Sequence, residues 1–229
     1  MREARLALAI FSLGFLFGCA TAGRDFPRPT EQDLKLGQTS KVEVIGKYGP
    51  PKEERTVTMK LKAPDAKEPD PNAESGLLTR AFYSFVDPRG DAIDGVSPQR
   101  AAYFWFWNDK LISYHYLSSF KQDSTDFPTD AITKIERGKS TESEVRALLG
   151  QPSGYGIYPE TKYPEDRSLV YAYFEWNKAH RNTQFKKLMV YIKPDGVVRD
   201  LKYDNSTKGL PPPPASSGGV TTIYVPSKR

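Results

Sequence analysis

Very few residues in this chain could carry out covalent or metal chemistry. The sequence holds one cysteine and two histidines among 229 residues. His115 lies in SYHYL, an alternating stretch that predicts a strand, and we interpret it as an ordinary surface or partly buried histidine. His180 lies in the polar segment NKAHRNTQ, with no second histidine or carboxylate pair nearby to suggest a metal site.

Sequence motifs for other reactions are also missing. No glycine-rich phosphate loop follows a predicted strand, and there is no Gly-x-Ser-x-Gly elbow. The acidic residues of PDAKEPDPN have the composition of a solvated loop rather than of paired acid and base catalysts. We therefore predict no catalytic residues, no metal site, no cofactor and no small-molecule substrate.

Cys19 stands out because its position indicates a specific modification. Residues 1–18 combine two arginines with the apolar run LALAIFSLGFLFG, which is too short to span a bilayer comfortably and is typical of an export signal. The following LFGC resembles the lipobox of bacterial lipoproteins, in which the thiol is acylated and cleavage leaves the cysteine as the new N-terminus. A soluble secreted protein cleaved near CATAG remains the alternative. Charged and turn-forming residues from Arg24 onward argue against a single-pass anchor.

Acyl chains such as palmitate on Cys19 would hold the protein on a membrane. Each buried methylene contributes about 0.8 kcal/mol, so two or more chains anchor a protein almost permanently. Ala20 follows the cysteine. By resemblance to the sorting rule of Gram-negative lipoproteins, this residue favours the outer membrane, with the chain facing the periplasm. Since the chain has a single cysteine, no intrachain disulfide can form.

Charge and length set further bounds. The formal net charge of +5 is a small surplus for this length and does not indicate nucleic-acid binding, and an exported protein has little contact with genomic nucleic acid. The length suits one large domain or two small ones.

The two ends of the mature chain differ in composition from its centre. Residues 19–29 have the small, charged and proline residues of a tether. Residues 206–229 form a predicted tail, in which a proline run precedes a Ser/Gly stretch. The final VTTIYVPSKR alternates at Val220, Thr222 and Tyr224, and is either a disordered tail or a short peptide that adds to a sheet edge.

The centre of the chain contains one short motif twice. GQTSKVEVIGKYGPP and GKSTESEVRALLGQP begin 101 residues apart, and each predicts a capped helix that ends at a glycine and a proline. Thr39 and Ser140 can accept the free N–H groups of the first turn, and Thr141 with Glu144 offers a second capping-box register. The matched motif residues are Gly37, Thr39, Gly49 and Pro51 in the first copy, and Gly138, Ser140, Gly150 and Pro152 in the second.

The regions around these motifs predict two similar modules, at residues 30–120 and 127–205. Each opens with a further short helix candidate, TEQDLKL or TDAITKIER, and closes with three stretches of strand-like alternation joined by turns. The predicted fold class is α+β: two tandem α-α-β-β-β modules, each with two short helices on a three-stranded antiparallel sheet. The insertion in the first module contains TVTMKLK, which could form an extra strand.

Aromatic residues give the positive signal for binding. In YFWFW, alternation places Tyr103, Trp105 and Trp107 on one face of a strand and two phenylalanines on the other. Only one of these faces can pack on helices, so the other forms either a core between modules or a protein-binding surface. The loop at residues 153–167 contains three tyrosines, Tyr155, Tyr158 and Tyr163, which either contact a partner or pack on the sheet.

The paired helix motifs followed by strands, behind a lipobox, resemble the SmpA/OmlA (BamE-like) family of outer-membrane lipoproteins. The pattern is also similar to the fold of the secreted beta-lactamase inhibitor protein, a tandem duplication of such a unit. The resemblance implies a non-enzymatic envelope lipoprotein that acts as a protein-binding adaptor or structural component, linked to outer-membrane protein assembly or envelope integrity. The alternative is an inhibitor that blocks a periplasmic or secreted hydrolase with a concave two-module sheet. An envelope enzyme with scattered site residues is a third hypothesis.

Overall fold

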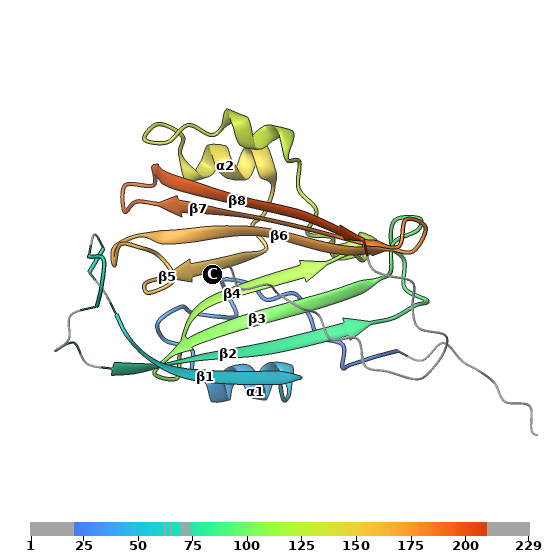
Figure 1. The fold of residues 1–229 in the computed structure, drawn as a ribbon, viewed down its shortest axis with the longest axis horizontal. Helices are drawn as coiled ribbons and strands as arrows, with labels where there is room; N and C mark the ends of the chain where they lie inside the picture. The colour runs from blue at the N-terminus through green and yellow to red at the C-terminus, as the bar shows by residue number, and fades with distance from the viewer. Residues whose placement is uncertain (1–20, 62, 65, 70–72, 74, 210–229) are drawn as a thin grey trace, which may run out of the picture.

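The protein forms one eight-stranded antiparallel sheet in which every strand pairs with its neighbour in the sequence (Figure 1). The computed structural model describes residues 21–61, 63–64, 66–69, 73 and 75–209. The strands are β1 Glu53–Lys60, β2 Ser75–Val86, β3 Gln99–Trp107, β4 Lys110–Ser118, β5 Gly154–Ile157, β6 Arg167–Asn177, β7 Asn182–Ile192 and β8 Val198–Gly209. The helices are α1 Lys41–Tyr48 and α2 Glu142–Leu149, with short 3-10 turns η1 Lys121–Asp123 and η2 Asp130–Lys134.

The predicted fold class of two tandem α-α-β-β-β modules is wrong. Strands β4 and β5 pair directly, through Ser113 with Gly156, Tyr114 with Tyr155 and His115 with Gly154, so one sheet crosses the expected boundary. The first helix candidate of each module also fails, since TEQDLKL forms turns and TDAITKIER forms only η2. Both segments are too short to sustain an α-helix without extensive packing.

Two strands complete the sheet beyond the six that were predicted. The TVTMKLK segment contributes most of β1, which forms one edge of the sheet. β1 pairs with β2 along its whole length, from Glu53 opposite Phe82 to Lys60 opposite Ser75. The tyrosine-rich loop contributes β5, a strand of only four residues. β8 forms the other edge and continues to Gly209, beyond the expected start of the tail at residue 206.

Both helices begin with the same capping arrangement. The Ser40 hydroxyl accepts the backbone N–H of Glu43, whose carboxylate accepts the backbone N–H of Ser40. Thr141 and Glu144 make the same reciprocal pair in α2, which confirms the capping-box register predicted there. Such caps typically contribute about 1 kcal/mol each, because they satisfy N–H groups that have no partner within the helix.

The residues first expected to cap the helices have a different role. Thr39 accepts the N–H of Lys35 through its hydroxyl (2.8 Å), and Ser140 accepts the N–H of Glu136 in the same way (2.9 Å). Their side chains therefore close the turn before each helix. Their carbonyl groups fix that turn to a strand, because each accepts a backbone N–H from β4 or β8 (2.8 Å in both).

Both helices also end alike. Gly49 and Gly150 follow the last turn with φ of 82° and 80°, a region that favours glycine. The carbonyl oxygens of these glycines accept the hydroxyl groups of Tyr83 (2.9 Å) and Tyr171 (3.1 Å). A buried tyrosine of the sheet thus holds the end of each helix.

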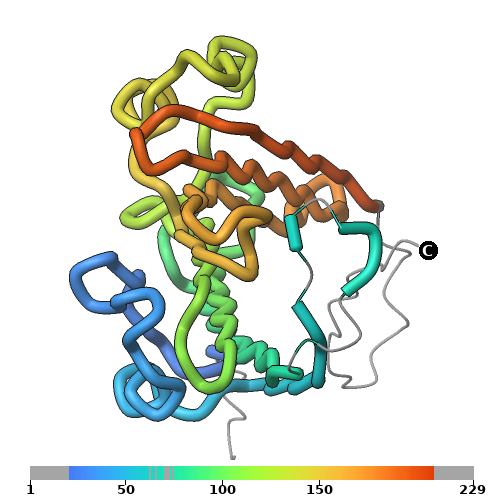
Figure 2. The backbone as a smooth tube through the Cα atoms, turned by 90° about the vertical axis from the view of Figure 1, so that its left-hand side faces the viewer, coloured from blue at the N-terminus to red at the C-terminus, as the bar shows by residue number. Residues whose placement is uncertain are grey.

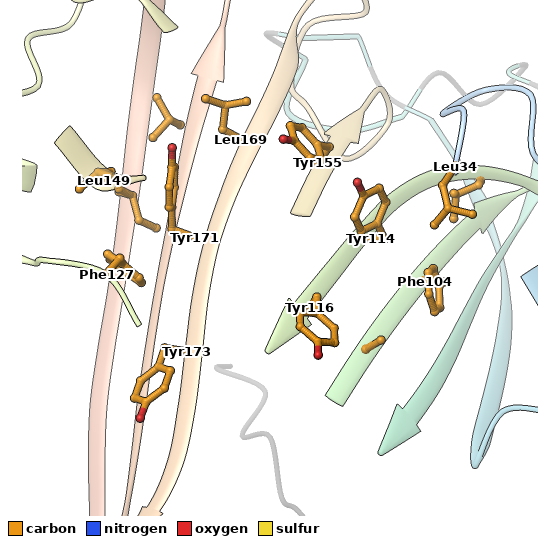
Figure 3. Packing of buried hydrophobic residues seen from close by; sticks show 14 of the residues in the cluster. Leu34, Phe104, Tyr114, Tyr116, Phe127, Leu149, Tyr155, Leu169, Tyr171 and Tyr173 are labelled. Carbon is orange, nitrogen blue, oxygen red and sulfur yellow. The ribbon is translucent and has the colours of Figure 1, made fainter. Parts of the chain in front are cut away.

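One hydrophobic core lies between the helices and the sheet. It takes Val44 and Tyr48 from α1, Val145 and Leu149 from α2, and alternate residues of most strands. The side chains of the two halves meet in the middle, where Tyr155 lies between Tyr114 and Leu169 (Figure 3). Because this face is covered continuously, each short helix gains the packing that it lacks alone.

The described part of the predicted tether is bound to the sheet instead of extending from it. Ala22 and Val86 exchange two backbone hydrogen bonds of 2.9 Å, and Phe26 is buried in the core. The guanidinium of Arg100 forms ion pairs with Asp25 and with Asp123 of η1 (3.2 Å to the latter). Two acidic side chains balance the charge of this buried cation, while its Nε is buried without a hydrogen-bond partner among the described residues.

We expect two neighbouring tyrosines of this core to respond differently to loss of the hydroxyl group. The Tyr48 hydroxyl is buried and has no hydrogen-bond partner among the described residues, whereas the Tyr83 hydroxyl donates to Gly49. Tyr83→Phe should therefore lower the free energy of unfolding by about 1 kcal/mol, whereas Tyr48→Phe should leave it unchanged or raise it. Urea denaturation of both variants measures this, and equal losses would contradict the core geometry.

Candidate binding face of the sheet

The sheet has a second face that neither helix covers. Directly paired residues of neighbouring strands lie on the same face, so the register places Tyr103 beside Phe82 and His115, and Trp105 beside Arg80 and Ser113. We call this face, which no helix covers, the open face. Six of its side chains are partly buried: Arg80, Tyr103, Trp105, Trp107, Lys187 and Tyr191. Eight others are buried: Phe82, Ser113, His115, Leu117, Ser168, Val170, Ala172 and Met189. Viewed along the sheet, both helices lie on one side and the described parts of segment 60–75 on the other (Figure 2).

Aromatic rings form a continuous row across the open face. The ring centroids of Phe82 and Tyr103 are 4.7 Å apart, those of Tyr103 and Trp105 are 5.7 Å apart, and those of Trp105 and His115 are 4.3 Å apart. The Arg80 guanidinium lies 5.9 Å from the Tyr103 ring. Each such contact contributes roughly 0.5–1.5 kcal/mol beyond area burial, so the row is a stable platform.

A buried polar cluster lies at the end of this row. His115 Nε2 is 2.7 Å from Glu160 Oε1, and their side chains are only 5% and 17% exposed. Glu160 belongs to the loop that follows β5, and its other oxygen accepts the Ser168 hydroxyl at 3.2 Å. Ser113 Oγ is 3.3 Å from the same His115 nitrogen.

The charges of the cluster follow from burial and from one lysine. Burial, and then the positive charge of Lys187, lowers the pKa of His115 by more than Glu160 raises it. Burial alone would raise the pKa of Glu160, but the positive charge of a protonated His115, the hydrogen bond with His115 and the charge of Lys187 reverse this, and the pKa of Glu160 is lowered. The two groups are therefore coupled: the charge on each one shifts the pKa of the other, and one hydrogen bond joins His115 Nε2 to Glu160 Oε1.

This geometry does not match a nucleophile–histidine–acid relay. Such a relay needs the nucleophile and the acid on opposite nitrogens of the ring, so that the acid orients the imidazole while it takes the proton. Here Ser113 and Glu160 both lie at Nε2. The arrangement fixes the position of the Glu160 loop instead.

Glycines in β5 allow this loop to approach the sheet. A Cβ atom at Gly156 would lie 1.5 Å from Glu160 Oε2, and one at Gly154 would lie 2.0 Å from the carbonyl oxygen of Tyr114. The first position admits the carboxylate and the second admits the backbone of β4. Glycine is therefore required at both positions for different reasons.

A pocket of about 690 Å³ lies beside the cluster. One wall is the loop from Tyr158 to Tyr163. Another wall is formed by Met59 of β1 and by Leu61 and other residues that follow this strand. Tyr191 of β7 and Arg199 to Lys202 of β8 form the rest. It is a wide hollow open to solvent, and its lining is mostly apolar with lysine and arginine side chains among it.

The predicted binding residues divide between the two faces. Tyr103, Trp105 and Trp107 lie together on the open face and are partly buried, as the alternation predicts. Tyr158 and Tyr163 lie at the pocket, where the Arg199 guanidinium stacks 4.3 Å from the Tyr163 ring.

Tyr155 is not on the open face. Its ring packs 5.7 Å from Tyr114 in the core, and its hydroxyl accepts a hydrogen bond from Arg146 (3.1 Å). It joins the sheet to α2 and cannot contact a partner at the pocket. Strand β5 explains the difference, because alternation places Tyr155 opposite its two glycine neighbours.

The remaining predicted residues are structural or lie outside the described chain. The eight residues of the repeated motif lie at or next to the ends of α1 and α2, in the turns described above. Cys19, residues 1–18 and the last ten residues lie outside the described residues. His180 lies exposed in the turn between β6 and β7.

Sequence reasoning missed Glu160 and Lys187. Neither residue lies in a motif, and their approach to His115 depends on the fold of a loop and on the β6–β7 pairing. The available signal was the Gly-x-Gly spacing of residues 154–156, which within a strand marks a close approach by another group.

Comparisons with known proteins add no assignment. No family model, no curated protein and no solved structure matches the chain. The resemblance to SmpA/OmlA lipoproteins therefore stays a prediction. In the part of the chain that the structure describes, no helix is long and apolar enough to span a bilayer, and no group of three or more His, Cys, Asp and Glu side chains could hold a metal ion.

We expect the two glycines of β5 to differ in their tolerance of a methyl group. Gly154→Ala would push a side chain into backbone and should cost more than about 3 kcal/mol of unfolding free energy, because β4 and β5 could not pair. Gly156→Ala meets the end of a flexible side chain and should cost about 1–3 kcal/mol by displacing Glu160.

A double-mutant cycle tests this explanation. The cost of Gly156→Ala should become smaller in a Glu160→Ala background, because the displaced carboxylate is then absent. Urea denaturation measures the coupling. The control is Gly46→Ala at an exposed position of α1, where a Cβ meets nothing within 4 Å. This control should raise the free energy of unfolding by about 0.5–1 kcal/mol. Strict additivity of the two substitutions at β5 would contradict the proposed contact.

Proposed function

We propose that this protein is a non-enzymatic lipoprotein of the bacterial cell envelope that uses the open face to bind another envelope protein. The observation that carries the proposal is the row of Tyr103 and Trp105, packed on buried Phe82, on a sheet face that no helix covers and that exposed Val57 and Met59 extend. In this role the protein is an adaptor or structural component, linked to outer-membrane protein assembly or to envelope integrity.

The composition of the row supports protein binding. Tyrosine, tryptophan and arginine supply most of the binding energy at protein interfaces, because they combine a large apolar area with a polar group. The row contains all three, with Arg80 above Tyr103. Its rings are held by neighbouring rings before any partner arrives, so binding would cost little side-chain entropy.

Two edges of the face extend the apolar surface. Val57 and Met59 of β1 are 55% and 39% exposed, beside Trp107 and Gly76 on the same face. On the other side, Tyr191 and Met189 continue the surface towards the pocket. A partner that covered this surface would bury side chains that strand pairing alone leaves in water.

The proposed location depends on Cys19 and on the export signal before it. Acylation of this cysteine would keep the open face at the membrane surface and at a high local concentration of envelope partners.

We expect a photo-crosslinking amino acid at Trp107 to capture the partner in intact cells. The matched control is the same amino acid at Val42, which is 76% exposed on α1, on the helix-bearing side of the sheet. Arg80→Ala and Tyr103→Ala should each reduce capture at least about fivefold, since truncation of a central interface aromatic or arginine residue costs more than about 1 kcal/mol.

The identity of the captured protein separates the hypotheses. An envelope assembly component supports the adaptor function, whereas a stoichiometric hydrolase that loses activity would assign the inhibitor function. Equal capture from positions 107 and 42 would contradict the open face as the binding surface.

We expect Cys19 to be the site of lipid attachment. An alkyne-tagged fatty acid fed to cells should label the wild-type protein, and Cys19→Ala should remove the label, because the chain has no other thiol. The control variant His180→Ala, in an exposed turn, should keep the label. Label retained by Cys19→Ala, or absent from the wild type, would contradict the anchor.

A further inference from the structure

The loop from Tyr158 to Asp166 connects the polar cluster of the open face to the pocket. Its Glu160 side chain reaches His115, and its residues Tyr158 to Tyr163 form one wall of the pocket. We propose that Glu160 and His115 form a latch that positions this wall, and that acid releases the latch and opens the pocket. This inference concerns the protein without a partner and does not rest on the proposed function.

The closed position of the loop is fixed by a set of specific contacts. Glu160 lies 2.7 Å from His115 and 3.2 Å from Ser168, over the one position of β5 where only glycine leaves room for its carboxylate. At the far end of the loop, Asp166 is held by Arg199 through bonds of 2.6 and 2.9 Å. The segment between these two attachments carries the pocket wall.

The charges that face the latch come from the loop and from β7 and β8. His115 faces Glu160 of the loop and Lys187 of β7. Lys187 in turn faces Glu160 and, from β8, Asp204 and Lys202. Trp105 covers the imidazole from β3, and the hydroxyl groups of Ser113 and Ser168 complete the surroundings.

The direction of the pH effect follows from proton linkage. In the closed state the pKa values of His115 and Glu160 are both lowered. Release of the loop admits water, and both pKa values return towards the ordinary values of about 6.5 for histidine and about 4.3 for glutamate. The open state therefore binds protons more strongly, so acid favours it. For each proton taken up, the equilibrium constant between the closed and the open loop changes by up to about tenfold per pH unit.

Trp105 provides a direct reporter of the latch. Its ring is 4.3 Å from that of His115, and a protonated imidazole at this distance quenches indole fluorescence. The chain has two other tryptophans, so Trp107→Phe with Trp176→Phe leaves Trp105 as the only one. We expect its fluorescence to fall in one transition with a midpoint below about pH 6.5.

Hydrogen exchange reports on the loop itself. Peptides covering residues 158–166 should lose protection with the same midpoint, after correction for the intrinsic pH dependence of exchange, whereas far-UV circular dichroism should stay constant. His115→Gln should abolish the fluorescence transition and move the loss of protection to the lower pH at which Glu160 alone takes up a proton. His180→Gln, at the only other histidine, should leave both unchanged.

Two further variants distinguish a latch from a purely structural contact. Gly156→Ala displaces the carboxylate and should leave residues 158–166 unprotected even at pH 7.5. Glu160→Gln keeps an acceptor for His115 but removes the negative charge that raises its pKa, so the fluorescence midpoint should move to lower pH.

Three results would overturn the proposal. The first is a fluorescence transition at which exchange of residues 158–166 does not change. The second is a loss of protection that keeps the same midpoint in His115→Gln. The third is the absence of any transition before global unfolding. The first would leave His115 as a buried titrating group that does not move the loop.

Discussion

The structure depends on three residue pairs between β4 and β5. These pairs join two four-stranded halves into one sheet, and they exist because Gly154 allows β5 to lie against the backbone of Tyr114. Without them each helix would cover a small sheet of its own, which is near the lower limit for a stable unit. With them, one core extends from α1 to α2, and the open face is continuous from Trp107 to Tyr191. The same short strand brings Glu160 to His115, so the latch and the junction of the two halves share one element.

The local parts of the fold could be predicted because their causes lie within a few residues. Both helices, their glycine ends and the capping box of Thr141 follow from side-chain types at fixed spacing. The alternation of Tyr103 to Trp107 likewise determined which side chains share a face. What could not be predicted was the number of strands and the single sheet. β5 has four residues, two of them glycine, and carries almost no periodic signal.

The candidate site was predicted in part, for a similar reason. The aromatic row lies on strands, where alternation is informative. Tyr155, Tyr158 and Tyr163 lie close together in the sequence, but one enters the core and two reach the pocket, because a strand begins among them. The contact of His115 with Glu160 spans 45 residues and depends on the course of an irregular loop. No pattern within either segment specifies it.

The attachment of the N-terminal segment has a consequence for how the protein would sit on a membrane. Ala22 is already paired with Val86, so a lipid on Cys19 would be joined to the folded domain by about three residues, or roughly 10 Å of extended chain. One headgroup layer is about 5–8 Å thick, so this length would keep the domain close to the bilayer surface. The end of the sheet at Val86 and Gln99 would lie next to the headgroups. The open face would then be held within reach of proteins embedded in the same leaflet.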